Sequence, residues 1–150
     1  MIKQNIYIAR LLLLIPYFEG STVATNNINN TGHKHLLIIE DDLDITDILT
    51  VLFTDEGYTV TSINQTDDII RTVEEVKPDL IITDYILEGI NGGEYCSQVK
   101  NNPETAHIPV VLLSGYAKVL ESLGNYGADA VIYKPFDNNE LIDTVGAMLS

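Results

Sequence analysis

The stretch PDLIITD, residues 78–84, is a short apolar run that ends in a carboxylate. Apolar runs of about four to eight residues without polar alternation are typical of parallel strands that are buried on both faces. Five apolar runs, mostly without polar alternation, follow one another along the chain: Leu36–Ile39, Tyr58–Ile63, Leu80–Thr83, Val110–Leu113 and Ala130–Tyr133. They predict a five-stranded parallel sheet.

Helical patterns separate these runs. Apolar residues recur at helical spacing from Ile45 to Phe53 and predict the first helix, and two more helices are expected over residues 93–101 and 116–123. The residues expected to begin or end helices are Gly57 after the first, Thr66 and Pro78 around the second, and the capping box Asp137–Glu140 before the last. Strands that alternate with helices predict an α/β fold, a doubly wound (βα)5 parallel sheet.

Residues 1–34 differ in composition from the rest of the chain. They carry Lys3, Arg10 and Lys34 against a single acidic residue, Glu19, and include an Asn/Thr-rich run over residues 25–31. We therefore expect a flexible N-terminal extension over residues 1–34 and one domain over residues 35–150. The clean apolar run 11–15 is far shorter than the roughly 20 residues that cross a bilayer, so no membrane span is expected.

Composition limits the kinds of partner. Eight Lys and Arg residues against 22 Asp and Glu residues give a net charge of −14, which repels phosphate backbones and anionic membrane surfaces. We expect no direct binding to nucleic acid. The only cysteine, Cys96, can form neither an intramolecular disulfide nor a Cys-based metal cage, which fits a cytoplasmic location.

Polar side chains follow four of the predicted strands. Glu40 and Asp41 come after the first, Asp84 after the third, Ser114 after the fourth and Lys134 after the fifth. Ligand sites of open parallel sheets lie beyond the carboxyl ends of the strands, so these side chains are expected to meet at one edge.

The chemistry of these groups is complementary. Clustered carboxylates raise one another's pKa unless a cation neutralises them, and an all-oxygen cluster suits Mg2+. A hydroxyl and an ammonium suit the oxygens of a phosphoryl group. A carboxylate can itself be the nucleophile in forming an acyl phosphate, and Asp84 is the best placed because it ends the central-looking run.

Alternatives exist for individual residues. Asp42 and Asp44 are better interpreted as solvated or helix-capping residues. Taken alone, Ser114 could belong to a turn and Lys134 to the surface. The segment DLDIT, residues 42–46, resembles the DxDxT motif of haloacid-dehalogenase-type phosphatases, in which Asp42 would be the nucleophile; a helical pattern that begins immediately afterwards argues against it.

Residues 36–149 resemble the receiver domain of two-component response regulators, of the stand-alone, single-domain type. The segments that carry the resemblance are LLIIEDD, PDLIITD, VVLLSG and GADAVIYKPF, in the family's order and near its spacing. The resemblance implies a flavodoxin-like fold, with Asp84 as phospho-acceptor and Asp41 as a direct Mg2+ ligand. It also implies that Glu40 reaches the ion through water and that the Ile86 carbonyl completes the protein ligands.

The same resemblance implies roles for the remaining groups. Ser114 would hold a phosphoryl oxygen, Lys134 would pair with the phosphoryl group, and the Lys134–Pro135 bond would be cis. The phosphoryl donor would be a histidine kinase or a phosphotransfer protein, and output would pass through contacts with a downstream protein. The chain would then be no enzyme beyond its own phosphorylation and dephosphorylation. The alternative is a pseudo-receiver that only binds partners.

The sequence departs from the family pattern at two places. Leu87-Glu88 stands where the family usually has Leu-Pro, although Gly92 and Gly93 keep the glycine that follows. Val131 stands where the family usually has a switch Tyr or Phe, three residues before Lys134. These departures put the usual signalling surface in doubt and leave the site chemistry intact.

Overall fold

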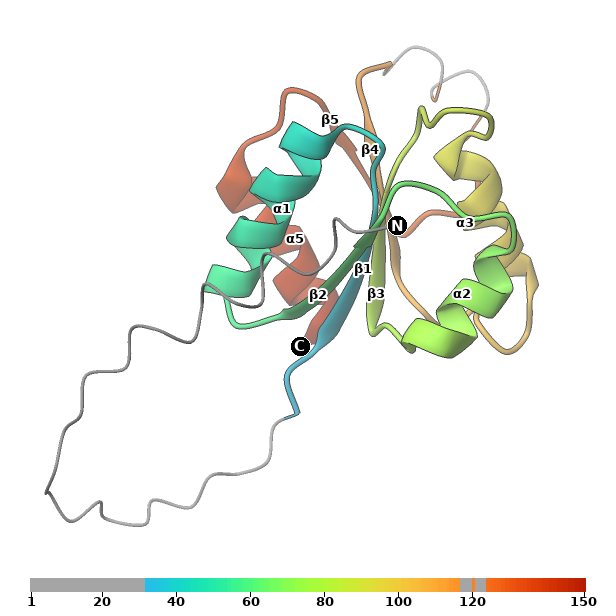
Figure 1. The fold of residues 1–150 in the computed structure, drawn as a ribbon, viewed down its shortest axis with the longest axis horizontal. Coiled ribbons are helices and arrows are strands. Elements are labelled where there is room, and N and C mark those ends of the chain that lie inside the picture. The colour runs from blue at the N-terminus through green and yellow to red at the C-terminus, as the bar shows by residue number, and fades with distance from the viewer. Residues whose placement is uncertain (1–31, 117–119, 121–123) are drawn as a thin grey trace, which may run out of the picture. The chain divides into compact units, whose positions relative to one another are not determined.

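The computed structural model describes residues 32–116, 120 and 124–150. These residues form a five-stranded, all-parallel sheet in the order β2-β1-β3-β4-β5, flanked by helices (Figure 1). The strands are β1 (His35–Ile39), β2 (Thr59–Ile63), β3 (Leu80–Asp84), β4 (Val110–Ser114) and β5 (Ala130–Tyr133). The helices are α1 (Leu43–Asp55), α2 (Ile69–Val76), α3 (Gly92–Asn101) and α5 (Asn138–Leu149). The predicted doubly wound fold is therefore confirmed.

The unbroken apolar runs of the central strands result from helices on both faces of the sheet. Successive side chains of a strand point to opposite faces, so both parities must be apolar when both faces are covered. In β1, Leu36 and Ile38 pack with α1 and α5, whereas Leu37 and Ile39 pack with α2 and α3. Figure 1 shows the two helical layers on either side of the sheet.

The expectation that every strand is buried on both faces is wrong for the two edge strands. Thr59 and Ser62 of β2 are exposed, as is Tyr133 of β5, whereas β1 and β4 are almost wholly buried. An edge strand has a neighbour on one side only, so fewer of its side chains are covered. In the Tyr58–Ile63 run the polar residues Thr59, Thr61 and Ser62 were the sequence signal of this partial exposure.

Helix starts follow side-chain capping. The carboxylates of Asp42 and Asp137 accept backbone N–H groups at the starts of α1 and α5, as their interpretation as caps predicts. The predicted cap Thr66 is wrong for α2: Asp68 is the N-cap and accepts from the Arg71 N–H at 3.0 Å. Thr66 lies just outside and its hydroxyl accepts from the Asp68 N–H.

Two expectations fall largely beyond the described part of the chain. The N-terminal extension assigned to residues 1–34 is described only from Gly32, where the Lys34 ammonium meets an Asp79 carboxylate oxygen at 3.0 Å. Of the helix expected over residues 116–123, six residues, 117–119 and 121–123, lie outside the described part of the chain. Within the described residues, no helix has the length and apolar character needed to cross a bilayer.

Candidate functional site

The strand order places the candidate site at the carboxyl ends of β1 and β3. The chain runs from β1 outward to β2 and then returns past β1 to β3, so the crossover direction reverses between these two neighbours. Such a switch point leaves a crevice beyond the strand ends. Asp84 and Ser114 are themselves the last residues of β3 and β4, one residue further into the sheet than the sequence indicated, because they pair with Leu113 and Tyr133.

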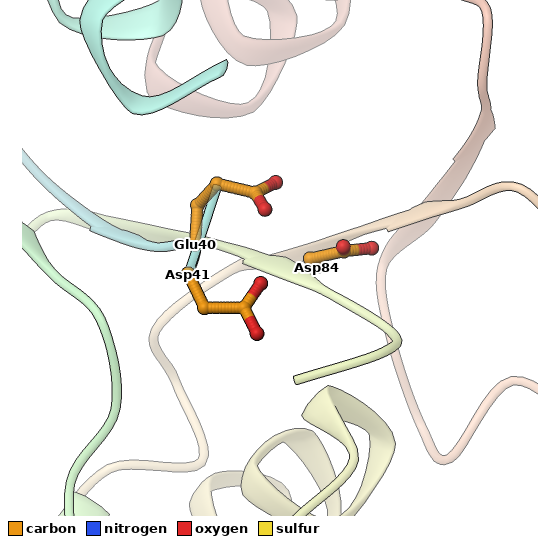
Figure 2. Close-up of side chains that lie close together, drawn as sticks. All are labelled: Glu40, Asp41 and Asp84. Carbon is orange, nitrogen blue, oxygen red and sulfur yellow. The ribbon is translucent and has the colours of Figure 1, made fainter. Parts of the chain in front are cut away.

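Three carboxylates meet at this edge. Glu40 and Asp41 follow β1, Asp84 ends β3, and each offers an oxygen within 4.8 Å of the others (Figure 2). Their exposure differs: Glu40 is 1% exposed, the Asp84 side chain is 13% exposed, and Asp41 is open to solvent. The predicted clustering of these three residues is what the geometry shows.

Lys134 connects two of the carboxylates. Its Nζ lies 2.9 Å from a Glu40 oxygen and 3.0 Å from an Asp84 oxygen. Burial alone would lower the pKa of the Lys134 ammonium, but the hydrogen bonds to Glu40 and Asp84 outweigh burial and hold that pKa above its usual value. The lysine is therefore a fixed cation beside Asp84.

The position of Glu40 disfavours the ionised form of its carboxyl. Burial raises the pKa of its carboxyl, the hydrogen bond from Lys134 opposes that effect, and the Asp84 charge adds to it; the pKa stays above its ordinary value. Its second oxygen accepts the Asp42 N–H at 3.2 Å. A further cation would lower the energy of the ionised form.

The donor set fits a divalent cation. Three carboxylates carry −3 when ionised and Lys134 carries +1, so −3 + 1 leaves −2 at one edge of the sheet. Oxygen ligands in a partly open, charged site suit Mg2+, which keeps several of its waters and takes only one or two carboxylates. Asp41 and Asp84 are more accessible than the buried Glu40, although Lys134 also contacts Asp84.

Asp41 is held from the loop that follows β3. Its Oδ2 accepts the backbone N–H of Glu88 at 3.0 Å. Ile86, which the resemblance gives as a carbonyl ligand, lies in the same loop and pairs with Asn91 in an isolated antiparallel bridge. Leu87 and Ile90 of this loop pack in the cluster that includes α2 and α3, so the loop lies on that side of the sheet.

Ser114 lies fully buried at the end of β4, and its hydroxyl oxygen accepts the Tyr116 N–H at 3.0 Å. The Lys134 N–H donates to the Ser114 carbonyl at 2.8 Å, which ties the two strand ends together. The Lys134–Pro135 bond is cis, as the resemblance implies. All strand-end groups that the sequence singled out thus lie along one edge.

Asp42, the nucleophile of the phosphatase alternative, is outside this cluster. Its Oδ1 accepts the N–H groups of Asp44 and Ile45 at 2.9 and 3.2 Å, and the residue is exposed. The carboxylate is used as a helix cap, which is the simpler of its two interpretations.

Sequence reasoning missed two close approaches beside the site. A Cβ on Gly92 would lie 2.6 Å from the Thr83 hydroxyl oxygen and would also collide with the Asp84 carbonyl. A Cβ on Gly93 would lie 2.7 Å from the ring of Tyr126. The adjacent glycines Gly92 and Gly93 were the available sequence signal, but only the fold shows which groups approach each glycine closely.

The position of the expected switch aromatic is filled by a small side chain. Val131 is partly buried against the cluster that includes α2 and α3, whereas Tyr133 is 43% exposed. Tyr133, two positions further along β5, has the same strand parity as Val131, but its side chain is exposed, so it does not take the place of the missing ring.

Comparison with known proteins gives a consistent result. The profile of the "Response regulator receiver domain" family matches residues 36–146. The phosphate regulon transcriptional regulatory protein PhoB of Rhizobium meliloti (strain 1021) is 32% identical over 116 residues, which cover 76% of this chain and 51% of that protein. This chain thus spans about half the length of that relative.

Solved structures show the same fold. A putative response regulator from Chloroflexus aurantiacus J-10-fl is 28% identical with a TM-score of 0.72, covering 78% of this chain and 98% of that one. The signal receiver domain of a signal transduction histidine kinase from Syntrophus aciditrophicus is 30% identical with a TM-score of 0.70, covering 77% and 89%. With its five parallel strands and its carboxylates and lysine at one edge, the chain belongs to the response regulator receiver domain family of two-component systems.

Proposed function

We propose that this receiver domain is a phosphorylation-switched signalling module that accepts a phosphoryl group on Asp84 in a Mg2+-dependent reaction. The observation that carries the proposal is the position of the Asp84 carboxylate, with the Lys134 ammonium at 3.0 Å and two further carboxylates gathered around it. The donor is a histidine kinase or a phosphotransfer protein, and output passes through contacts with a downstream protein.

The residues have separate tasks. An Asp84 oxygen attacks phosphorus, the bond from phosphorus to the donor's leaving group breaks, and the leaving group departs with that electron pair. Lys134 offsets negative charge on the phosphoryl oxygens, and the Ser114 hydroxyl holds one of them after releasing the Tyr116 N–H.

Asp41, Asp84 and the Ile86 carbonyl would hold Mg2+, with Glu40 reaching it through water. When bound, the ion supplies positive charge to the phosphoryl oxygens. The set of carboxylates with a residual charge of −2 supports this assignment. The same intact set argues against a pseudo-receiver, which would have no need of it.

The absence of direct DNA binding remains a prediction from the net charge of −14. PhoB is named as a transcriptional regulator, and this chain matches about half of it.

The extension over residues 1–34 is likewise proposed to be dispensable for phosphorylation. A deletion that keeps Lys34 is the proper test, because this residue contacts Asp79.

Intact mass after incubation with acetyl phosphate and Mg2+ tests the proposal. The wild-type chain is expected to gain one phosphoryl group, Asp84→Asn to gain none, and the cap variant Asp42→Asn to gain it as the wild type does. Labelling of Asp84→Asn together with loss in Asp42→Asn would contradict the proposal and favour the phosphatase alternative. No labelling of the wild type would favour the pseudo-receiver.

A further inference from the structure

The contact between the Glu88 N–H and the Asp41 carboxylate joins two loops that are distant in sequence. The donor and acceptor are 3.0 Å apart and separated by 47 residues. Asp41 is exposed, so its side chain would otherwise be free to rotate in solvent. A hydrogen bond to an ionised acceptor is among the stronger ones and fixes one of the two oxygens.

This contact depends on what stands at position 88. The family that this chain resembles usually has proline there, and proline carries no backbone N–H. A chain with proline at this position could not make the bond seen here. The departure from the family pattern therefore adds a donor beside the carboxylate cluster.

The loop that carries this donor is itself well held. The Tyr85 N–H donates to the Leu113 carbonyl at 2.7 Å, and the Gly92 N–H donates back to the Tyr85 carbonyl at 2.8 Å. Between them, Ile86 pairs with Asn91 and the Leu87 side chain is 7% exposed. The loop is thus closed at its base and anchored before Glu88, so the N–H is directed by structure that does not depend on Asp41.

We propose that the Glu88 N–H is a positioning group for Asp41: by holding Oδ2 it leaves Oδ1 directed toward the divalent cation. The inference rests on the Mg2+ role given to Asp41 in the proposed function. Groups that hold a metal ligand from behind reduce the conformational freedom that the ligand must lose on binding. The effect acts through the backbone and does not need the Glu88 carboxylate.

The decisive comparison is between Glu88→Pro and Glu88→Ala, both of which remove the carboxylate while only the proline removes the N–H. Mg2+ affinity is measured by calorimetry on the full chain, without a phosphoryl donor. We expect Glu88→Pro to bind Mg2+ about ten-fold more weakly than Glu88→Ala. Equal affinities within about three-fold, or tighter binding by the proline variant, would overturn the proposal.

A second measurement avoids the proline substitution in case that variant does not fold. Amide hydrogen exchange in the metal-free protein reports the bond directly. The Glu88 amide is expected to exchange at least about five-fold faster in Asp41→Ala than in the wild type, with the Gly92 amide unchanged. An unchanged Glu88 rate would contradict the proposal. Neither readout uses phosphorylation, so a failure of Asp84 as acceptor would be seen separately.

Discussion

Glu40 and Lys134 show how single residues are fixed at this site. Glu40 is 1% exposed and its carboxylate would be costly to bury alone, but Lys134 lies 2.9 Å away and also reaches Asp84. These residues, with Asp41, Asp84 and Ser114, could be predicted from the sequence, because each stands where an apolar run ends. The Glu88 contact could not, since nothing in the local pattern tells which loop amide meets Asp41.

Cys96 gives a prediction at the same scale. Its side chain is 1% exposed in α3, and burial, the largest cause, raises the pKa of its thiol from 9.0 to about 11. Because the folded-state pKa is raised, the contribution to stability is complete below pH 9 and is lost as the pH rises toward 11. The slope is up to about 1.4 kcal/mol per pH unit.

Urea unfolding at a series of pH values measures this effect. The wild type is expected to be more stable than Cys96→Ala at pH 8, because the substitution leaves a small cavity, and this advantage should shrink between pH 9 and 11. A pH-independent difference between the two proteins would show that the thiol titrates equally in both states.

At the scale of elements, the start of α3 depends on a close fit to the turn before β5. Tyr126 has a φ of 56°, its ring covers Gly93, and its hydroxyl lies 3.3 Å from that of Tyr85. Tyr85 directly follows Asp84, so this packing lies next to the proposed acceptor. The helix itself could be predicted from the sequence. The contact of Tyr126 with Gly93 could not, because the two residues are more than thirty positions apart and periodicity reports only on local structure.

Gly93→Ala tests this fit. The new Cβ would lie within 3 Å of the Tyr126 ring, so the ring must move, and we expect a loss of about 1–3 kcal/mol in unfolding free energy. In Tyr126→Ala the ring is absent, and adding Gly93→Ala to it should cost much less. A double-mutant cycle by chemical denaturation checks this, with additive effects of the two substitutions as the contradicting result.

At the scale of the whole molecule, the strand order gathers carboxylates at one edge of the sheet, in a chain that is strongly acidic overall. The order β2-β1-β3-β4-β5 brings Glu40 and Asp41, which follow β1, beside Asp84, which ends β3, and the chain as a whole carries −14. Sequence alternation predicted this architecture, because each strand and helix carries its own pattern. The interpretation of all five runs as buried on both faces overstated the burial of β2, whose two exposed residues, Thr59 and Ser62, are polar.

Mg2+ is expected to stabilise the folded chain as a whole. Binding to the native state alone adds roughly 1–3 kcal/mol at about ten to a hundred times the dissociation constant. Melting temperatures are compared at equal ionic strength set with NaCl, because screening alone would stabilise so acidic a protein. Asp41→Ala should lose most of the response, whereas Asp47→Ala, which removes an exposed carboxylate of α1, should keep it. Equal melting temperatures with and without Mg2+ in the wild type would count against the metal site.

The central claim is that Asp84 becomes an acyl phosphate, and chemical trapping tests it most directly. Borohydride reduces an aspartyl phosphate to homoserine, so the wild-type chain is treated with acetyl phosphate and Mg2+, reduced, digested and sequenced by mass spectrometry. The account predicts homoserine at position 84, dependent on Mg2+ and on the phosphoryl donor. Homoserine at position 41 or 42 with aspartate retained at 84, or no homoserine in any peptide, would contradict it.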